Sequence, residues 1–400
     1  MKLGLFLIIL CIFTIIIAYM TYNIYEYMGN SLEIREINSY KKKCHTINIP
    51  TTLSHLIPIN DIYLIASEFK SLEFYNFKDY LNGFAAQKKE DNLYLFNIKK
   101  QKYEKAKIMD FPGNIPFHPD GLSLYKKSEN SYVLYVINHA VNLIYAGKER
   151  VEKINLEYNP HNEEVTLTYD SGIILGDEFF LRVDSISVIE PDVFYFTTNK
   201  PFPSPGDEEV LINYKKIIHF FFYNFLETLL TMLNIKKCNT YLYYNNVTTK
   251  VLQSGSLLNK GIAYDKKRKL LYIIKSMEKK LNVFEVHYDN DYYTKLIKKI
   301  PILYVGNNIY YDENKDLIYI GINGKMNEYY AIIDSYKKNN NFDKVDVYSG
   351  YEIIDPKNNY SINELMIMKN DYKWVSSAIE TNDNIYMSSI FTNGIYTCEK

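Results

Sequence analysis

One pattern of apolar and polar positions repeats from about residue 50 to the end of the chain. An apolar strand is followed by a turn of Asp, Asn, Lys or Gly, and then by a second strand rich in Tyr and Ile. Six such second strands have cores at 63–65, 134–136, 194–196, 271–273, 318–320 and 385–387. Repeats of roughly 40–50 residues with several short strands are typical of propeller blades. The pattern predicts an all-β fold, a six-bladed β-propeller that occupies residues 44–400 as one domain.

The beginning of the chain does not follow this pattern. Residues 3–20 are apolar without a charge, which just reaches the length that a helix needs to cross a bilayer. The run ends in the bulky Tyr19 and Met20, which favours an uncleaved signal anchor over a cleaved signal peptide. Lys2 precedes the run, and the basic side is normally cytoplasmic. We expect a single-pass membrane protein with a polar stem at 21–43 and a lumenal or extracellular propeller in the secretory pathway.

Residues 207–236 also depart from the strand pattern. This stretch contains neither Gly nor Pro, begins with three acidic residues and ends beside Lys236 and Lys237. Acids at the start and bases at the end are typical of a helix. Two interpretations stay open. The helix lies on a membrane or over the mouth of the propeller, or it packs its apolar side against the propeller itself.

Composition indicates which cellular compartment and which classes of partner are compatible with the chain. The 46 basic and 47 acidic residues nearly cancel, so no nucleic-acid partner is predicted. Cys44 and Cys398 stand at the two ends of the predicted domain, and in an oxidising compartment they would form a disulfide. Two unrelated free thiols are the alternative. The sequons at Asn246 and Asn359 predict N-glycosylation and fit a lumenal domain.

The motifs that carry known chemistry are few. The chain has no Gly-rich phosphate loop, no CxxC, no HExxH and no G-x-S-x-G, so it offers no sequence signature of the enzymes that use them.

Several short motifs occur in an ordered series. They are F-x-P-x-G-[IL]-S at 117–123, a strand ending in V-[VI]-N-H at 134–139, D-x-[IV]-x-x-x-x-P-[ED]-x-F-Y at 184–195, N-x-G-I at 259–262, N-I-x-x-D at 308–312 and I-Y-x-C-E at 395–399. In this order and spacing the chain resembles the paraoxonase/arylesterase family from about Cys44 to its end. The resemblance implies a six-bladed propeller with calcium in the central tunnel and hydrolysis of aryl esters and lactones. It also places 207–236 where the family has a membrane-contacting helix.

The resemblance implies calcium ligands at the inner ends of successive blades, and there the sequence departs from the family. Calcium takes six to eight oxygen ligands, several of them carboxylates. Asp184 keeps a carboxylate, and Asn307 and Asn308 keep amide oxygens. Leu53, Ser54 and Ser185 stand where the family has carboxylates, and Lys260 stands where it has Asn. We hypothesise that the Lys260 ammonium takes the place of the ion and bridges Asp184 to the amide of Asn307 or Asn308, since Lys can donate to three acceptors.

The histidine dyad that the resemblance implies is also altered. His139 matches its second member, but Asp120 stands at the first position and His118 lies two residues earlier. A neutral imidazole is suited to deprotonating water near neutral pH. His139 and His118 are therefore the candidate bases, with Asp120 as an orienting carboxylate. The alternative is that His139 is a strand-end histidine whose nitrogens are satisfied by backbone hydrogen bonds.

Two kinds of function remain open from the sequence. The first is a membrane-anchored hydrolase of the paraoxonase type, whose calcium-dependent activity is weak or lost because its centre is degenerate. The second is a non-catalytic propeller that assists assembly of a membrane protein or binds one, or that binds lipid or a small ligand. The membrane would be contacted through 3–20 and through 207–236.

Overall fold

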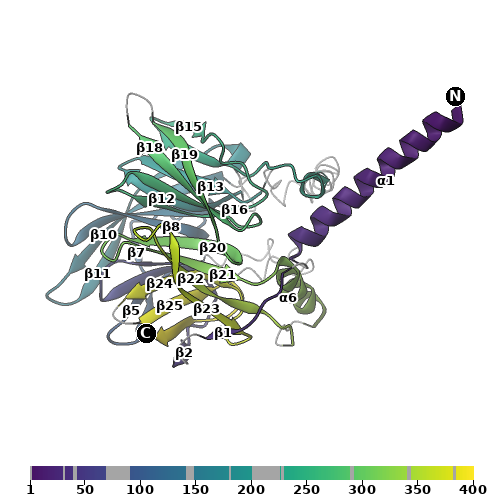
Figure 1. Ribbon diagram of the computed structural model, residues 1–400. Coiled ribbons are helices and arrows are strands. Elements are labelled where there is room, and N and C mark those ends of the chain that lie inside the picture. The colour runs from purple at the N-terminus through teal and green to yellow at the C-terminus, as the bar shows by residue number, and fades with distance from the viewer. Residues whose placement is uncertain are drawn as a thin grey trace.

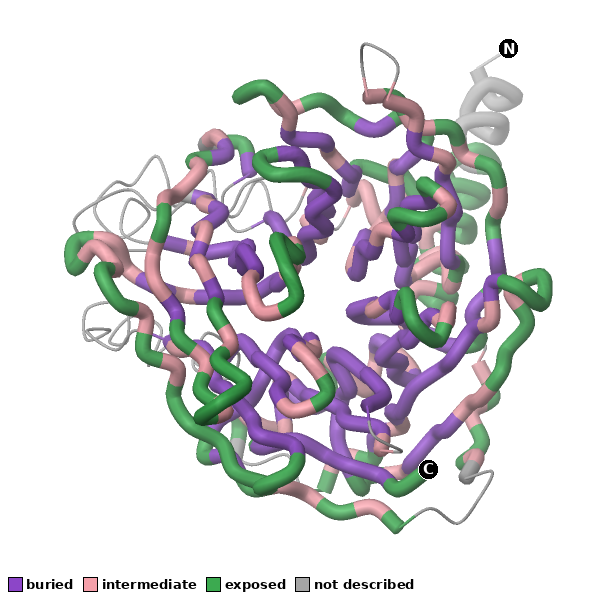
Figure 2. Tube along the Cα trace, turned by 90° about the vertical axis from the view of Figure 1, so that its left-hand side faces the viewer, coloured by how far each residue is buried: buried purple, intermediate pink, exposed green. Residues whose placement is uncertain are grey.

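The computed structural model describes residues 2–29, 32–38, 43–68, 91–140, 148–179, 182–200, 226, 229–288, 292–339, 344–381 and 384–400. Six mainly antiparallel sheets stand around a common axis (Figures 1 and 2). Each sheet is a blade, and the innermost strand of each blade contacts that of the next until the sixth contacts the first. The predicted six-bladed propeller is confirmed.

The first three blades follow the chain in order. Blade 1 contains β3 (Leu53–Pro58), β4 (Tyr63–Glu68), β5 (Leu93–Asn97) and β6 (Lys102–Lys105). Blade 2 contains β8 (Pro119–Lys126), β9 (Ser131–Ala140), β10 (Lys148–Asn159), β11 (Glu164–Ile174) and β7 (Ile108–Met109). Blade 3 contains β12 (Val183–Glu190), β13 (Val193–Thr198), β14 (Thr240–Tyr244) and β15 (Val247–Lys250).

The last three blades include two strands from the beginning of the domain. Blade 4 contains β16 (Asn259–Asp265), β17 (Leu270–Lys275), β18 (Lys280–His287) and β19 (Tyr293–Pro301). Blade 5 contains β20 (Val305–Asp312), β21 (Leu317–Asn323), β22 (Tyr348–Asp355), β23 (Ser361–Lys369) and β1 (Ile37–Asn38). Blade 6 contains β24 (Val375–Thr381), β25 (Asn384–Ser389), β26 (Ile395–Glu399) and β2 (Cys44–Ile47). Helices that the structure describes over their full length are α1 (Lys2–Tyr27), the short η1 (Asp177–Phe179) and α6 (Met326–Asn339).

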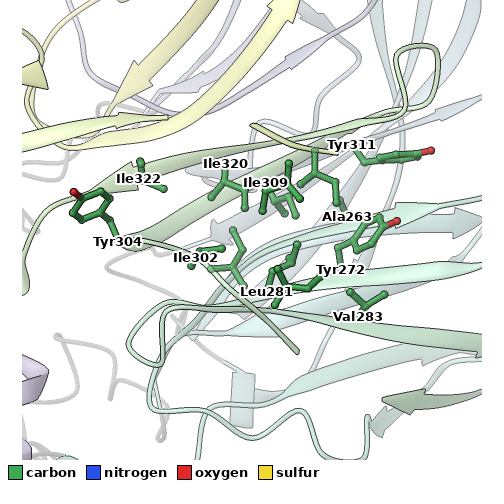
Figure 3. Close-up of a cluster of buried hydrophobic side chains, with 14 of the residues drawn as sticks. Ala263, Tyr272, Leu281, Val283, Ile302, Tyr304, Ile309, Tyr311, Ile320 and Ile322 are labelled. Carbon is green, nitrogen blue, oxygen red and sulfur yellow. The ribbon is translucent and has the colours of Figure 1, made fainter. Parts of the chain in front are cut away.

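The six apolar cores predicted from the repeat all lie in the second strand of a blade. These strands are buried on both sides because neighbouring blades pack face to face. Figure 3 shows one such contact, where Tyr272 and Leu281 of blade 4 meet Ile309 and Ile320 of blade 5. Strands buried on both faces read as nearly continuous apolar runs, which explains why the second strands gave the clearest signal.

A disulfide between Cys44 and Cys398 joins β2 and β26, the first and last strands of blade 6 in chain order. This bond was expected because the two cysteines stand at the ends of the predicted domain. The crosslink spans 354 residues of sequence. In the chain-entropy account a bond across so long a loop removes much freedom from the unfolded chain. It therefore closes the ring covalently where β2 pairs with β26. A disulfide is typical of a secretory or extracellular compartment.

The helices gather on one side of the propeller. The carbonyl of Met28, just after α1, accepts a hydrogen bond from Asn327 N of α6, and Asn23 donates to the carbonyl of Met232. Beyond these contacts α1 points away from the blades (Figure 1). The inner strand β20 begins on this same side, because Val305 pairs with Asn323 shortly before α6.

Three expectations about the segments outside the blades have different outcomes. α1 continues past residue 20, and β1 within the expected stem adds an outer strand to blade 5. In the part of the chain that the structure describes, no helix is long and apolar enough to span a membrane, so the anchor stays a prediction. Most of 207–236 lies outside the described residues, and its described end is helical at 229–232.

Candidate functional site

The candidate site lies where the inner strands begin, around the axis. Every inner strand has a register irregularity against its neighbour within its first few residues, at 53–56, 119–122, 183–185, 259–262, 306–309 and 375–377. Such irregularities re-aim side chains and are frequent beside functional sites. Ser54, Asp120, Asp184 and Lys260 all lie in these segments. Together with His139, we call them the axial cluster.

Glycine allows the blades to approach closely here. A Cβ on Gly121 would lie 2.8 Å from the carbonyl oxygen of Asp184, and one on Gly261 would lie 2.7 Å from that of Asn307. Neither backbone could accept a larger residue without moving. Gly121 and Gly261 thus let β8 pack closely against β12 and β16 pack closely against β20.

Asp184 and Lys260 form an ion pair between blades 3 and 4. The Lys260 Nζ lies 2.5 Å from Asp184 Oδ1, and Asn199 Nδ2 donates to the same oxygen at 2.8 Å. The Asp184 side chain is 6 % exposed and that of Lys260 is 25 % exposed. Burial raises the pKa of Asp184; the Lys260 charge opposes this shift, and the Asp120 charge adds to it. An ammonium this close favours the ionised carboxylate, so we treat the pair as ionic.

Asp120 joins blade 1 to blade 2. Its Oδ1 accepts a hydrogen bond from the Ser54 hydroxyl, and its Oδ2 lies 3.4 Å from His139 Nε2. Burial would raise the pKa of Asp120, but the hydrogen bond and charge of His139, the Ser54 hydroxyl and the Lys260 charge lower it. Asp120 is therefore a carboxylate, and the Ser54 hydroxyl, at a position where the resemblance implies a carboxylate, donates to it.

His139 contacts a second carboxylate. Its Nδ1 lies 2.8 Å from Glu149 Oε1, and the Glu149 side chain is fully buried. Burial would lower the pKa of His139, but the charge of Glu149 and the contacts with Asp120 and Glu149 raise it to about 10. An imidazolium accepts no proton, so the geometry does not favour His139 as a general base near neutral pH.

His118 belongs to a different pair. Its Nδ1 lies 2.9 Å from Asp91 Oδ2, and its backbone N–H donates to Asn138 Oδ1 at 2.8 Å. The backbone N–H of His139 donates to the His118 carbonyl. His118 is thus next to Asp120 along the chain, while its ring turns to Asp91 at the start of β5.

The Asn308 amide of blade 5 contacts blades 1 and 6. Asn308 Nδ2 donates to the Ser54 carbonyl at 3.2 Å and to Ser377 Oγ at 3.3 Å. Asn307 and Asn308 are both buried. The expected bridge from Lys260 to one of these amides stays a prediction, whereas its contact with Asp184 is present.

His55 is a buried titratable group that the sequence reasoning overlooked. It follows Ser54 on β3, and its Nδ1 accepts a hydrogen bond from the backbone N–H of Leu122 at 2.9 Å. Burial lowers the pKa of His55 to about 4, although the Asp120 charge acts in the opposite direction. His55 is therefore neutral and satisfies an N–H at the irregular start of β8.

The axial donors do not fit the calcium that the family resemblance implies. Both carboxylates already contact protein cations, Asp120 with His139 and Asp184 with Lys260. Within the described residues, no three His, Cys, Asp or Glu side chains are grouped to hold a metal. A divalent ion would have to displace an ammonium that lies 2.5 Å from its best ligand, so we route no chemistry through calcium here.

The two sequons lie in exposed turns between outer strands. Asn246 Oδ1 accepts a hydrogen bond from Tyr243, and Asn359 Oδ1 accepts one from Lys298 Nζ. Both contacts use the amide oxygen, whereas a glycan would attach to the nitrogen. N-glycosylation at Asn246 and Asn359 stays a prediction with which these positions are compatible.

Glu149, Asp91 and Asn199 were missed because no motif marks them, and Glu149 reaches the site only through strand pairing. Glu149 lies opposite His139 in the register of β9 and β10. The register of β9 and β10 depends on the length of the loop between these two strands, and no sequence motif marks a Glu within Lys148–Lys153. A carboxylate facing a strand-end histidine could have been sought by trying alternative registers.

Comparisons with known proteins identify the family by sequence. The arylesterase family profile matches residues 74–349, which is more than half of the chain. No curated protein sequence matches. Among solved structures, a luciferin-regenerating enzyme aligns at 10 % identity with a TM-score of 0.47, covering 90 % of this chain and 95 % of its own. A gluconolactonase from Xanthomonas campestris aligns at 8 % identity with a TM-score of 0.45, covering 91 % and 94 %.

Proposed function

This chain belongs to the arylesterase family, and from that membership we propose that it is a membrane-associated, paraoxonase-like propeller in which a lysine replaces the catalytic calcium. Hydrolysis of aryl esters and lactones is then weak or lost. The observation that carries the proposal is the Lys260–Asp184 contact of 2.5 Å between two adjacent inner strands.

The chemistry of ester hydrolysis explains why this contact matters. A metal ion polarises the carbonyl and stabilises the negative charge that develops on its oxygen. An ammonium can supply a single positive charge, but in this cluster it is already paired with Asp184. His139 is held as a cation and is not free to act as a base. The inherited reaction therefore lacks its electrophile, and His139 does not serve as its base.

The test compares calcium binding and hydrolysis in the full chain, purified in detergent. Calcium titration by calorimetry and assays with phenyl acetate and a lactone would be run with calcium and with a chelator. We expect no calcium binding and no calcium-dependent turnover. Tight binding together with calcium-dependent hydrolysis in the unaltered protein would contradict the proposal.

A variant makes the test sharper. Lys260→Asn restores the family residue and leaves Asp184 without its ammonium, so we expect it to gain calcium binding. Lys260→Arg, which keeps the positive charge, is the matched control and should not gain it. Equal behaviour of the two variants would show that the charge at position 260 does not exclude the ion.

A second candidate is a binding function at a membrane, for lipid or a membrane protein. The observation that favours it is that α1 leaves the propeller on the side where the inner strands begin, with Ile12, Phe13 and Ile15 more than half exposed. Apolar side chains in such number favour a lipid or protein surface. Flotation with vesicles, comparing the full chain with an Ile12→Asp/Ile15→Asp variant, tests membrane contact. Pull-down of membrane proteins then tests a chaperone-like role in assembly.

A further inference from the structure

His139 is enclosed by carboxylates from two different strands. Glu149 on β10 lies 2.8 Å from Nδ1, and Asp120 on β8 lies 3.4 Å from Nε2. The His139 side chain is 13 % exposed, and that of Glu149 is 0 % exposed. Both ring nitrogens therefore face oxygen atoms of acidic groups, at a site with little solvent.

This geometry restricts the protonation state of the ring. A neutral imidazole has one N–H and one lone pair. With two carboxylates, the lone pair would face a negatively charged oxygen, which is repulsive in a site of low dielectric. Protonation of both nitrogens puts a positive charge between the two carboxylates. The competing arrangement puts the proton on Glu149 and leaves the pair neutral.

We propose that Glu149 is a positioning residue that holds His139 as a fixed imidazolium, and that His139 and Lys260 together supply the two positive charges that a divalent ion would bring. Asp120, Asp184 and Glu149 carry three negative charges, which the two cations reduce to a net charge of −1. This inference rests on the proposed function, in which Lys260 supplies one of the two charges of the replaced calcium. The inference assigns the other charge to His139.

The experiment reads the protonation of His139 directly. The full chain in detergent, labelled with ¹⁵N and ¹³C in its histidines, would be followed by NMR from pH 6 to 9. The chain has seven histidines, and His139→Gln identifies the relevant signal. We expect both ring nitrogens to stay protonated throughout this range. In Glu149→Gln, the midpoint of protonation should fall by at least about two pH units, since one of the two stabilising charges is gone.

The control removes a carboxylate elsewhere on the same strand. Glu157 lies eight positions along β10, is exposed and accepts a hydrogen bond from Ser131. Glu157→Gln should leave the His139 signal unchanged. If Glu149→Gln does not fold, Asp120→Asn tests the same ring from its other side and should also lower the midpoint. A neutral His139 at pH 7 in the unaltered protein, or a midpoint insensitive to both variants, would overturn the proposal.

The outcome can be separated from that of the proposed function. Calcium binding by the unaltered protein would refute the replacement even if His139 is an imidazolium. A neutral His139 without calcium binding would refute the role of Glu149 alone. If both ideas hold, Lys260→Asn/His139→Gln should bind calcium at least about fivefold more tightly than Lys260→Asn, because a second positive charge has been removed while all three carboxylates remain.

Discussion

The two halves of the axial cluster stabilise their carboxylates differently. In blade 2, Asp120 contacts His139, which comes from the neighbouring strand of the same blade. Between blades 3 and 4, Asp184 contacts Lys260, which comes from the next blade. In the family resemblance, His139 matches a family histidine, whereas Lys260 stands where an Asn is expected.

Under the proposed replacement, this difference suggests how an ion can be replaced without changing the fold. The resemblance matches Asp184 to a family carboxylate and His139 to a family histidine, and the structure has Lys260 beside the first and Asp120 beside the second. In each contact the two residues carry opposite charge, so neither charge is left unpaired. Burying an unpaired charge is costly, which makes replacements of single residues in such a cluster dependent on each other.

Removing the Lys260 charge should cause the largest loss of stability among the substitutions proposed here. Lys260→Met leaves the Asp184 carboxylate 6 % exposed and without its ammonium. We expect a loss of about 2–4 kcal/mol in the free energy of unfolding, somewhat less than for a fully buried pair because Lys260 is partly exposed. Urea denaturation measures it. Adding Asp184→Asn to Lys260→Met should restore part of the loss.

An exposed ion pair provides the control for Lys260→Met. Lys338 lies 2.7 Å from Asp334 on α6, with both side chains more than half exposed. Lys338→Met should change stability by no more than about 0.5 kcal/mol. A loss in Lys260→Met as small as this would mean that the axial pair behaves as a surface pair.

The contribution of His139 should appear in how the free energy of unfolding depends on pH. The folded pKa of His139 is raised to about 10 from 6.5, so the folded chain keeps a proton that the unfolded chain loses. The stabilisation is complete below pH 6.5 and is lost as the pH rises towards 10, by up to about 1.4 kcal/mol per pH unit. His139→Gln should remove this slope from a series of urea denaturations, whereas His45→Gln, at an exposed histidine of β2, should keep it. The same slope in both variants would assign it to other groups.

Moving blade 2 away from blade 3 should have an intermediate effect on the stability of the fold. In Gly121→Ala, the new methyl would lie 2.6 Å from Ile137 Cδ1 and 2.8 Å from the Asp184 carbonyl, so blades 2 and 3 must move apart. We expect a loss of about 1–3 kcal/mol, as for other overpacked sites. Gly113→Ala has nothing within 4 Å and serves as the control. Thermal unfolding of both variants measures the difference, and equal melting temperatures would show that the contact can relax.

The fold could be predicted because its signal is local and repeated. Strands such as Leu271–Ile273 are apolar on both faces, and six of them at similar intervals admit few architectures. The disulfide followed from the positions of Cys44 and Cys398 at the ends of the domain. The strand β1 in the stem could not be predicted in this way, because two residues that pair at the edge of blade 5 carry no periodic pattern.

The site was predictable only in part. Asp120, Asp184, His139 and Lys260 could be placed around the axis because each lies in a short motif. Their partners are set by contacts between strands, and Glu149 reaches His139 only through the register of β9 and β10. The sequence therefore indicated His139 as a candidate base, whereas its second carboxylate neighbour favours a cation.

The smallest expected effect on stability concerns the Ser54 hydroxyl, which links blade 1 to the Asp120 half. The Ser54 hydroxyl donates to Asp120 Oδ1, and a hydrogen bond to a charged group is stronger than one between neutral groups. Ser54→Ala should lower the free energy of unfolding by about 1–2 kcal/mol. In a double-mutant cycle with Asp120→Asn, the two losses should not add, because either change removes the same charged contact.

Ser377→Ala is the control, because Ser377 Oγ accepts a hydrogen bond from the neutral Leu56 N–H. Its loss of stability should add to that of Asp120→Asn. If Ser54→Ala is also additive, the hydroxyl does not stabilise the carboxylate, and the support of Asp120 comes from His139 and the Lys260 charge.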